Sequence, residues 1–91
     1  AMTVKDADEA VRVGNGVEYG LAAAVWTRDI GKAHRIAKSL RAGMVYVNCY
    51  DADDITVPFG GFKQSGTGRD KSLHAFDKYT ELKTTWIDLA D

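Results

Sequence analysis

An acidic run in the middle of the chain carries residue types that could bind a cation. Asp51, Asp53 and Asp54 come shortly after residues 44–48, which read Met-Val-Tyr-Val-Asn. Such an apolar run is typical of a strand covered on both faces, and ligands of open α/β sheets bind beyond the carboxyl ends of strands. Carboxylates in that place favour a cationic ligand, with a solvated run of loop charges as the alternative.

A second candidate is the glycine-rich stretch at 57–70. It holds the only proline, four of the nine glycines and two of the three phenylalanines. Glycine reaches positive φ cheaply and proline fixes φ, so this composition predicts irregular backbone whose two rings press onto something. Neither phosphate-binding motif is complete, because no G-x-x-x-x-G-K-[ST] is present and Gly66-Thr67-Gly68 does not open G-x-G-x-x-G. A tight loop that holds Phe59 is favoured over a phosphate site.

The remaining chemistry-bearing residues are Cys49, His34 and His74. Cys49 is the only cysteine, so the chain has no internal disulfide, and a lone cysteine beside a buried strand is usually part of the packing. The two histidines lack metal-ligand spacing and are predicted to be solvated. No metal site is expected.

The composition is that of a globular protein. Ninety-one residues make one domain at most, or a piece of one, and 45% hydrophobic with 27% charged residues argues against disorder. A formal net charge of −1 gives no basis for binding nucleic acid or an anionic membrane. No apolar run approaches the roughly 20 residues of a membrane span and no signal-peptide layout is visible, so we expect a cytoplasmic protein.

The elements that must position these residues alternate between helix and strand. Asp6 and Asp29 each precede a helical pattern as N-caps, with Glu9 completing a capping box. We expect Gly14-Asn15-Gly16 to end the first helix in left-handed conformations and Gly43 to end the second. The predicted elements are a helix over 7–14, a strand over 21–27, a helix over 30–42 and a strand over 44–48. Strand, helix and strand at these spacings predict a right-handed parallel crossover, and therefore an α/β fold.

Two further elements follow the glycine-rich stretch. Residues 71–78 are predicted to form a short helix with Leu73 and Phe76 inward. Residues 81–89 alternate like a strand but have no hairpin partner nearby, so this strand needs another sheet to pair with.

Four runs carry a family resemblance: Asn-Cys-Tyr at 48–50, Pro-Phe-Gly-Gly-Phe-Lys-Gln-Ser-Gly-Thr-Gly-Arg-Asp at 58–70, Tyr-Thr-Glu-Leu-Lys at 79–83, and Glu-Tyr-Gly-Leu-Ala-Ala at 18–23. Together they resemble the C-terminal end of NAD(P)-dependent aldehyde dehydrogenases, most closely the members that act on amino- and guanidino-aldehydes. Asp70 departs from the family, which usually has Glu there, and keeps the charge.

The resemblance implies a fold and a function. Residues 1–70 would be the C-terminal part of the catalytic domain, and 71–91 a short helix with an oligomerisation arm. The family oxidises an aldehyde through a cysteine nucleophile, passes hydride to NAD or NADP, and hydrolyses the thioester with glutamate-activated water. All those groups lie upstream in the family, so no catalytic residue is expected here and the isolated chain would be inactive. The alternative for the isolated chain is a non-catalytic assembly module.

The resemblance also implies site residues. Phe59 would line the tunnel of the aldehyde substrate, with plain loop packing as the alternative. Asp53, with Asp51, would pair with a cationic tail of the substrate. Arg69 and Glu81 would be a charged pair near a subunit interface, with a weak exposed ion pair as the alternative. The interface of a homodimer or homotetramer would also include Leu82, Trp86 and Ile87.

Overall fold

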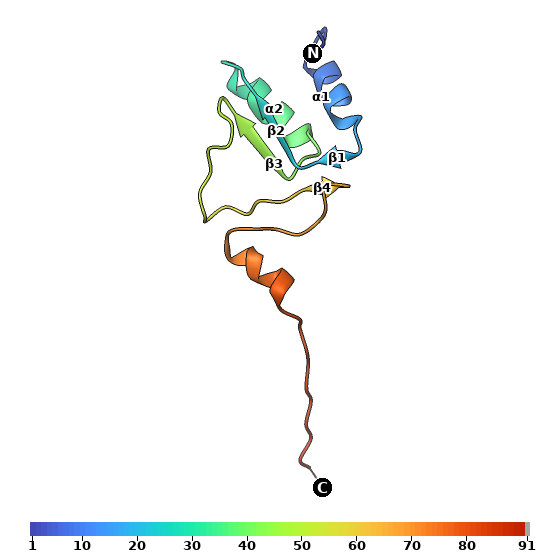
Figure 1. Ribbon diagram of the computed structural model, residues 1–91, viewed down its shortest axis with the longest axis vertical. Helices are drawn as coiled ribbons and strands as arrows, with labels where there is room; N and C mark the ends of the chain where they lie inside the picture. The colour runs from blue at the N-terminus through green and yellow to red at the C-terminus, as the bar shows by residue number, and fades with distance from the viewer. Residues whose placement is uncertain (91) are drawn as a thin grey trace.

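The computed structural model describes residues 1–90 and shows an elongated molecule, 73 Å along its longest axis (Figure 1). Two helices and four short strands form a body at one end, and the C-terminal residues extend away from it as a single thread. The predicted α/β class is confirmed. No helix among residues 1–90 is long and apolar enough to cross a membrane.

The centre of the body is a parallel strand pair. β2 (Ala22–Val25) and β3 (Met44–Val47) pair in register from Ala22 opposite Met44 to Val25 opposite Val47. α2 (Ile30–Ser39) connects them and packs against both. Ala33 and Ile36 of α2 and Tyr46 of β3 are the buried apolar residues, so the core is small. Ile30, expected on the inner face of the helix, is instead 71% exposed because it begins the helix outside this contact.

α2 ends three residues earlier than its apolar spacing predicts, because a side chain from the first helix intervenes. Asn15 donates from Nδ2 to the Ser39 carbonyl at 2.9 Å, and its Oδ1 accepts from the Arg41 backbone N–H at 2.8 Å. The prediction that Gly43 stops this helix is therefore wrong. Gly43 lies at the entry to β3, where a Cβ atom would come within 1.7 Å of the Gly60 carbonyl oxygen.

α1 (Ala7–Asn15) starts as predicted, since the Asp6 side chain accepts from the Glu9 backbone N–H at 2.8 Å. Glu9 reaches back one residue further than in a capping box and accepts from the Lys5 N–H at 2.8 Å. The prediction that residues 14–16 end this helix in left-handed conformations is wrong, because Gly16 has φ of −78° and its backbone N–H still donates to the Val13 carbonyl.

A second pair of strands ties the glycine-rich stretch to the body. β1 (Tyr19–Gly20) pairs antiparallel with β4 (Phe62–Lys63). β4 therefore forms regular structure inside the glycine-rich stretch at 57–70, whose backbone was predicted to be irregular. The Phe62 ring lies under two guanidinium groups, 4.7 Å from Arg41 and 5.5 Å from Arg69, which bears out the expectation that the rings of this loop are packed.

The C-terminal part has little contact with the body. η1 (Leu73–Tyr79) is a 3-10 helix in place of the predicted helix over 71–78. Leu73 and Phe76 are exposed, not inward, because no other described segment covers them. Residues 80–90 are extended, and no strand of residues 1–90 lies beside them (Figure 1), so the predicted pairing with another sheet stays a prediction. The last residue of the predicted arm, Asp91, lies outside the described residues.

Candidate functional site

The candidate site is the loop at 51–59, which leaves the carboxyl end of β3. Its three carboxylates have three different environments. Asp53 forms an ion pair with Lys71, with Nζ 2.8 Å from Oδ1, and its side chain is only 11% exposed. Its second oxygen, Oδ2, is buried and has no hydrogen-bond partner within residues 1–90. The pair therefore neutralises Asp53 inside the chain and leaves one acceptor atom unused.

The other two carboxylates are not bound to a cation. Asp54 accepts from the Thr56 hydroxyl and, at 2.8 Å, from the Thr56 backbone N–H, and these bonds hold the pKa of Asp54 below its ordinary value. Asp51 is exposed, sits at φ of 56°, and makes no ion pair in the described part of the chain. Asp51 is thus the carboxylate of this loop whose side chain makes neither an ion pair nor a hydrogen bond in the described part of the chain.

Phe59 closes the loop against the segment that leads to the arm. Its backbone N–H donates to the Asp70 carbonyl at 2.8 Å, and the Asp70 N–H donates back at 2.7 Å. Its half-buried ring lies 5.7 Å from the Lys71 ammonium. The structure therefore gathers Asp53 and Phe59, two of the three residues predicted to meet a substrate, around Lys71, which the sequence did not single out, while Asp51, the third, lies in the same loop.

Tyr46 is a second residue that the sequence analysis passed over. It is 5% exposed in β3, and its ring lies 5.4 Å from that of Tyr50, which directly precedes this loop. Burial raises the pKa of the Tyr46 hydroxyl, and the carboxylates of Asp53 and Asp51 raise it further. The only signal in the sequence was an aromatic residue with a polar tip inside an aliphatic strand.

Among residues 1–90, the residues predicted to form a subunit interface do not come together in one cluster. Arg69 donates from Nη1 to the carbonyls of Gly61, Thr67 and Gly68, at 2.9 to 3.0 Å, and so holds the glycine-rich loop together. No ion pair joins Arg69 to Glu81 within residues 1–90. The remaining predicted members, Leu82, Trp86 and Ile87, are exposed along the extended segment.

The cysteine and the two histidines, for which the sequence predicted no catalytic role, lie on separate segments. Cys49 is half-buried after β3, and His34 and His74 are both exposed on different helices. Over the described residues, no group of three or more His, Cys, Asp or Glu side chains is arranged to hold a metal ion.

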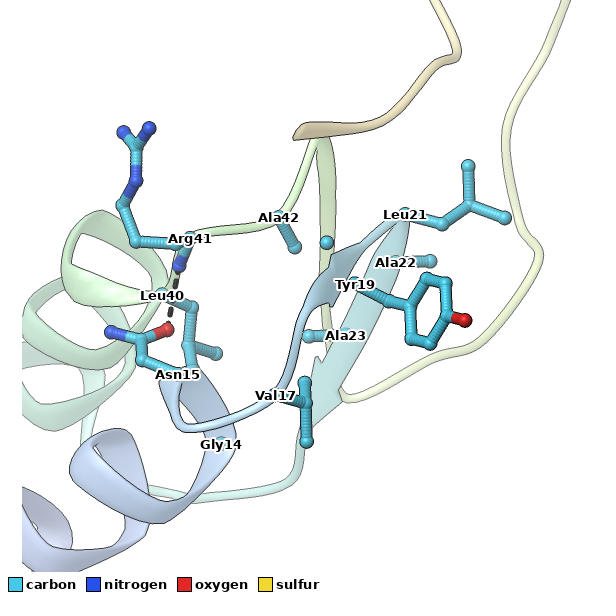
Figure 2. Close-up of a pocket in the computed structure, with 11 residues that line it drawn as sticks. Gly14, Asn15, Val17, Tyr19, Leu21, Ala22, Ala23, Leu40, Arg41 and Ala42 are labelled. Carbon is cyan, nitrogen blue, oxygen red and sulfur yellow. Dashed lines mark hydrogen bonds between the residues drawn. The ribbon is translucent and has the colours of Figure 1, made fainter. Parts of the chain in front are cut away.

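A separate hollow lies where α1 ends, between β1, the start of β2 and the turn after α2 (Figure 2). Its wall is mostly aliphatic side chains and backbone, and Asn15 is bonded there to the Arg41 backbone (Figure 2). Arg41 turns its guanidinium onto the Phe62 ring. The hollow is lined by neither a nucleophile nor an acid–base pair, so the loop at 51–59 is the better candidate.

Comparisons with known proteins agree on one protein family. The sequence profile of the aldehyde dehydrogenase family matches residues 1–85. Among curated relatives, the NADP/NAD-dependent aldehyde dehydrogenase PuuC of Escherichia coli (strain K12) is 61% identical over 82 residues, covering 90% of this chain and 17% of that protein.

Two solved structures are similar to the chain. The P. syringae AldA indole-3-acetaldehyde dehydrogenase, a mutant in complex with NAD+ and IAA, has a TM-score of 0.89 at 66% identity, covering 97% of this chain and 18% of that one. The γ-glutamyl-γ-aminobutyraldehyde dehydrogenase of Burkholderia cenocepacia J2315 has a TM-score of 0.85 at 64% identity, covering 90% and 17%. The chain spans less than a fifth of the length of these relatives.

Proposed function

Because the chain belongs to the aldehyde dehydrogenase family, we propose that it is the C-terminal part of an enzyme that oxidises an aldehyde to the carboxylic acid with NAD or NADP. Residues 1–70 complete the catalytic domain, with β2, α2 and β3 as a right-handed crossover. Residues 71–91 form the short helix and the oligomerisation arm. The similarity to full enzymes over nearly the whole chain supports this assignment.

The chain supplies the wall of the substrate tunnel and subunit contacts, while the reacting groups belong to the rest of the enzyme. Hydride acceptance is the chemistry that the dinucleotide supplies in such enzymes. The glycine-rich stretch completes neither phosphate-binding motif, and backbone already fills the open side of Gly60, where a Cβ would lie 2.1 Å from the Gly68 carbonyl oxygen. We therefore place NAD(P) binding, the nucleophilic cysteine and the glutamate base upstream.

The substrate we propose is an amino- or guanidino-aldehyde. The names of the similar structures divide between an indole aldehyde and an amino-type aldehyde, so identity alone does not select the class. The observation that carries the choice is the charge of the loop at 51–59, where three carboxylates beside Phe59 meet one ion-pairing lysine in the described chain. A cationic tail at the tunnel mouth would find Asp51 free to accept a charge-assisted hydrogen bond.

Steady-state kinetics on the full-length protein test both parts of the proposal. Formation of NADH or NADPH is followed with 3-aminopropanal against butanal, and with 4-guanidinobutanal against hexanal. We expect a higher kcat/KM for the cationic member of each pair. Equal values would refute the substrate class and leave the enzyme class standing, whereas no reduction of either dinucleotide with any aldehyde would refute the enzyme class.

The extended arm supports a second role in assembly. Trp86 is 89% exposed and Leu82 and Ile87 are also exposed, and an unpaired apolar strand of this kind favours pairing with another sheet. We propose that residues 81–89 pair with a neighbouring subunit of a homodimer or homotetramer in the cytoplasm, with Arg69 and Glu81 near that interface. Isolated from the rest of the enzyme, the chain would act only as an assembly module.

A further inference from the structure

Lys71 occupies the joint between the candidate site and the arm. The backbone turns sharply there, with positive φ at Lys71 (59°) and at Ser72 (52°). Both sides of the turn are bonded to the site loop, since Phe59 and Asp70 exchange two hydrogen bonds and the Ser72 N–H donates to the Ile55 carbonyl at 2.7 Å. Positive φ is unfavourable for residues other than glycine, so these bonds hold a conformation that the residue types would not choose alone.

This turn aims the Lys71 ammonium at two members of the site. Nζ lies 2.8 Å from Asp53 Oδ1 and 5.7 Å from the centre of the Phe59 ring. The Lys71 side chain is 33% exposed and that of Asp53 11%, so the pair is partly removed from water and less screened than a surface pair. It is the only ion pair that the carboxylates of the loop make within residues 1–90. The charge that the loop presents therefore depends on this one lysine.

We propose that Lys71 is a positioning residue that sets the charge selectivity of the aldehyde site. By pairing with Asp53 it cancels one negative charge beside Phe59 and leaves recognition of a cationic tail to Asp51. Lys71 acts through Asp53 and needs no contact with the substrate. This inference rests on the proposed function, because it concerns which aldehydes the tunnel prefers.

The test is a charge cycle in the full-length enzyme, read as the ratio of kcat/KM for 3-aminopropanal to kcat/KM for butanal. Lys71→Met leaves Asp53 uncompensated and should raise the ratio roughly fivefold, as for one partly screened charge near the tail. Asp53→Asn leaves Lys71 uncompensated and should lower the ratio by a similar factor. The double variant Lys71→Met/Asp53→Asn should return the ratio to the wild-type value.

Two controls accompany the cycle. Lys71→Arg keeps the charge and should retain the wild-type ratio. Arg12→Met removes a basic side chain from the ion pair with Glu9 on α1, a helix that packs against α2, and should also leave the ratio unchanged. If the pair of Lys71 and Asp53 were only structural, its loss would lower kcat/KM for both aldehydes equally. Single variants that leave the ratio unchanged would therefore overturn this inference and leave the proposed function standing. A wild-type enzyme that reduces neither dinucleotide would overturn the proposed function, and this inference with it.

Discussion

Gly43→Ala is the most direct test of how the glycine-rich stretch is joined to the parallel strands. A Cβ at position 43 would lie 1.7 Å from the carbonyl oxygen of Gly60 and 2.6 Å from its carbon. Ordinary contact begins at 3.4 Å, so the backbone at Gly60 would have to retreat by about 1.7 Å. No rotamer can relieve this overlap, because the atoms that clash belong to the main chain.

The loss of stability expected for Gly43→Ala follows from the contacts that hold Gly43 and Gly60 in place. The Gly43 N–H donates to the Gly20 carbonyl at 3.0 Å, and Gly60 is itself packed against the Gly68 carbonyl. Overpacking costs roughly 1–3 kcal/mol and a lost backbone hydrogen bond about 1 kcal/mol, so we expect a loss of about 2–4 kcal/mol in the free energy of unfolding.

The assay is urea unfolding of the full-length protein, with Gly68→Ala as the matched control. A Cβ at position 68 would meet only the Lys78 side chain, at 3.9 Å, so this variant should stay within about 0.5 kcal/mol of the wild type. If Gly43→Ala proved as stable as Gly68→Ala, the close approach of β3 to the glycine-rich stretch would be refuted.

Four further predictions concern the site, the arm and the helix caps. In the full-length enzyme, Asp51→Asn should lower kcat/KM for a cationic aldehyde roughly tenfold and spare an alkyl aldehyde, because a charge-assisted contact contributes about 1–2 kcal/mol; equal losses would make the loop structural. Deleting 81–91 should lower the mass measured by light scattering, and an unchanged mass would mean that the strand pairs within its own subunit. The isolated 91-residue chain should form no NADH from NAD and aminobutyraldehyde, whereas turnover that Cys49→Ser abolishes would contradict an upstream nucleophile. Asp29→Ala should unfold at a lower temperature than the wild type at neutral pH, since the carboxylate caps α2 by accepting from the Lys32 N–H at 2.9 Å. That bond holds the pKa of Asp29 below its ordinary 3.8, so the stabilisation is present above that value and is lost as pH falls through the lowered pKa; a difference that persists unchanged in acid would contradict the cap.

Local signals in the sequence were sufficient for the elements of the body. Asp6 and Asp29 cap the two helices because their side chains reach N–H groups three residues ahead, a relation that depends only on neighbouring residues. The apolar run at 44–48 marked β3, and the family resemblance rested on the same local strings. Carboxylates placed after this strand and a packed Phe59 were likewise predictable from types and spacing.

Contacts between distant segments could not be read from local patterns. Asn15 ends α2 from 24 residues away, and Gly43 is required by the Gly60 backbone and not by a helix end. β4 forms inside a glycine-rich stretch because β1 lies beside it, although two-residue strands carry no periodicity of their own.

The sequence by itself determined that this chain has an α/β body, an acidic loop after an apolar strand and an extended tail that finds no strand to pair with among residues 1–90. Only the tertiary structure decided how the charges of that loop are divided. Asp51 and Asp53 look equivalent in the sequence, yet Lys71 reaches one of them from 18 residues away and leaves the other free. The physical reason is that charge pairing depends on distance and solvent exposure, both of which are set when the turn at 70–72 folds back onto the loop.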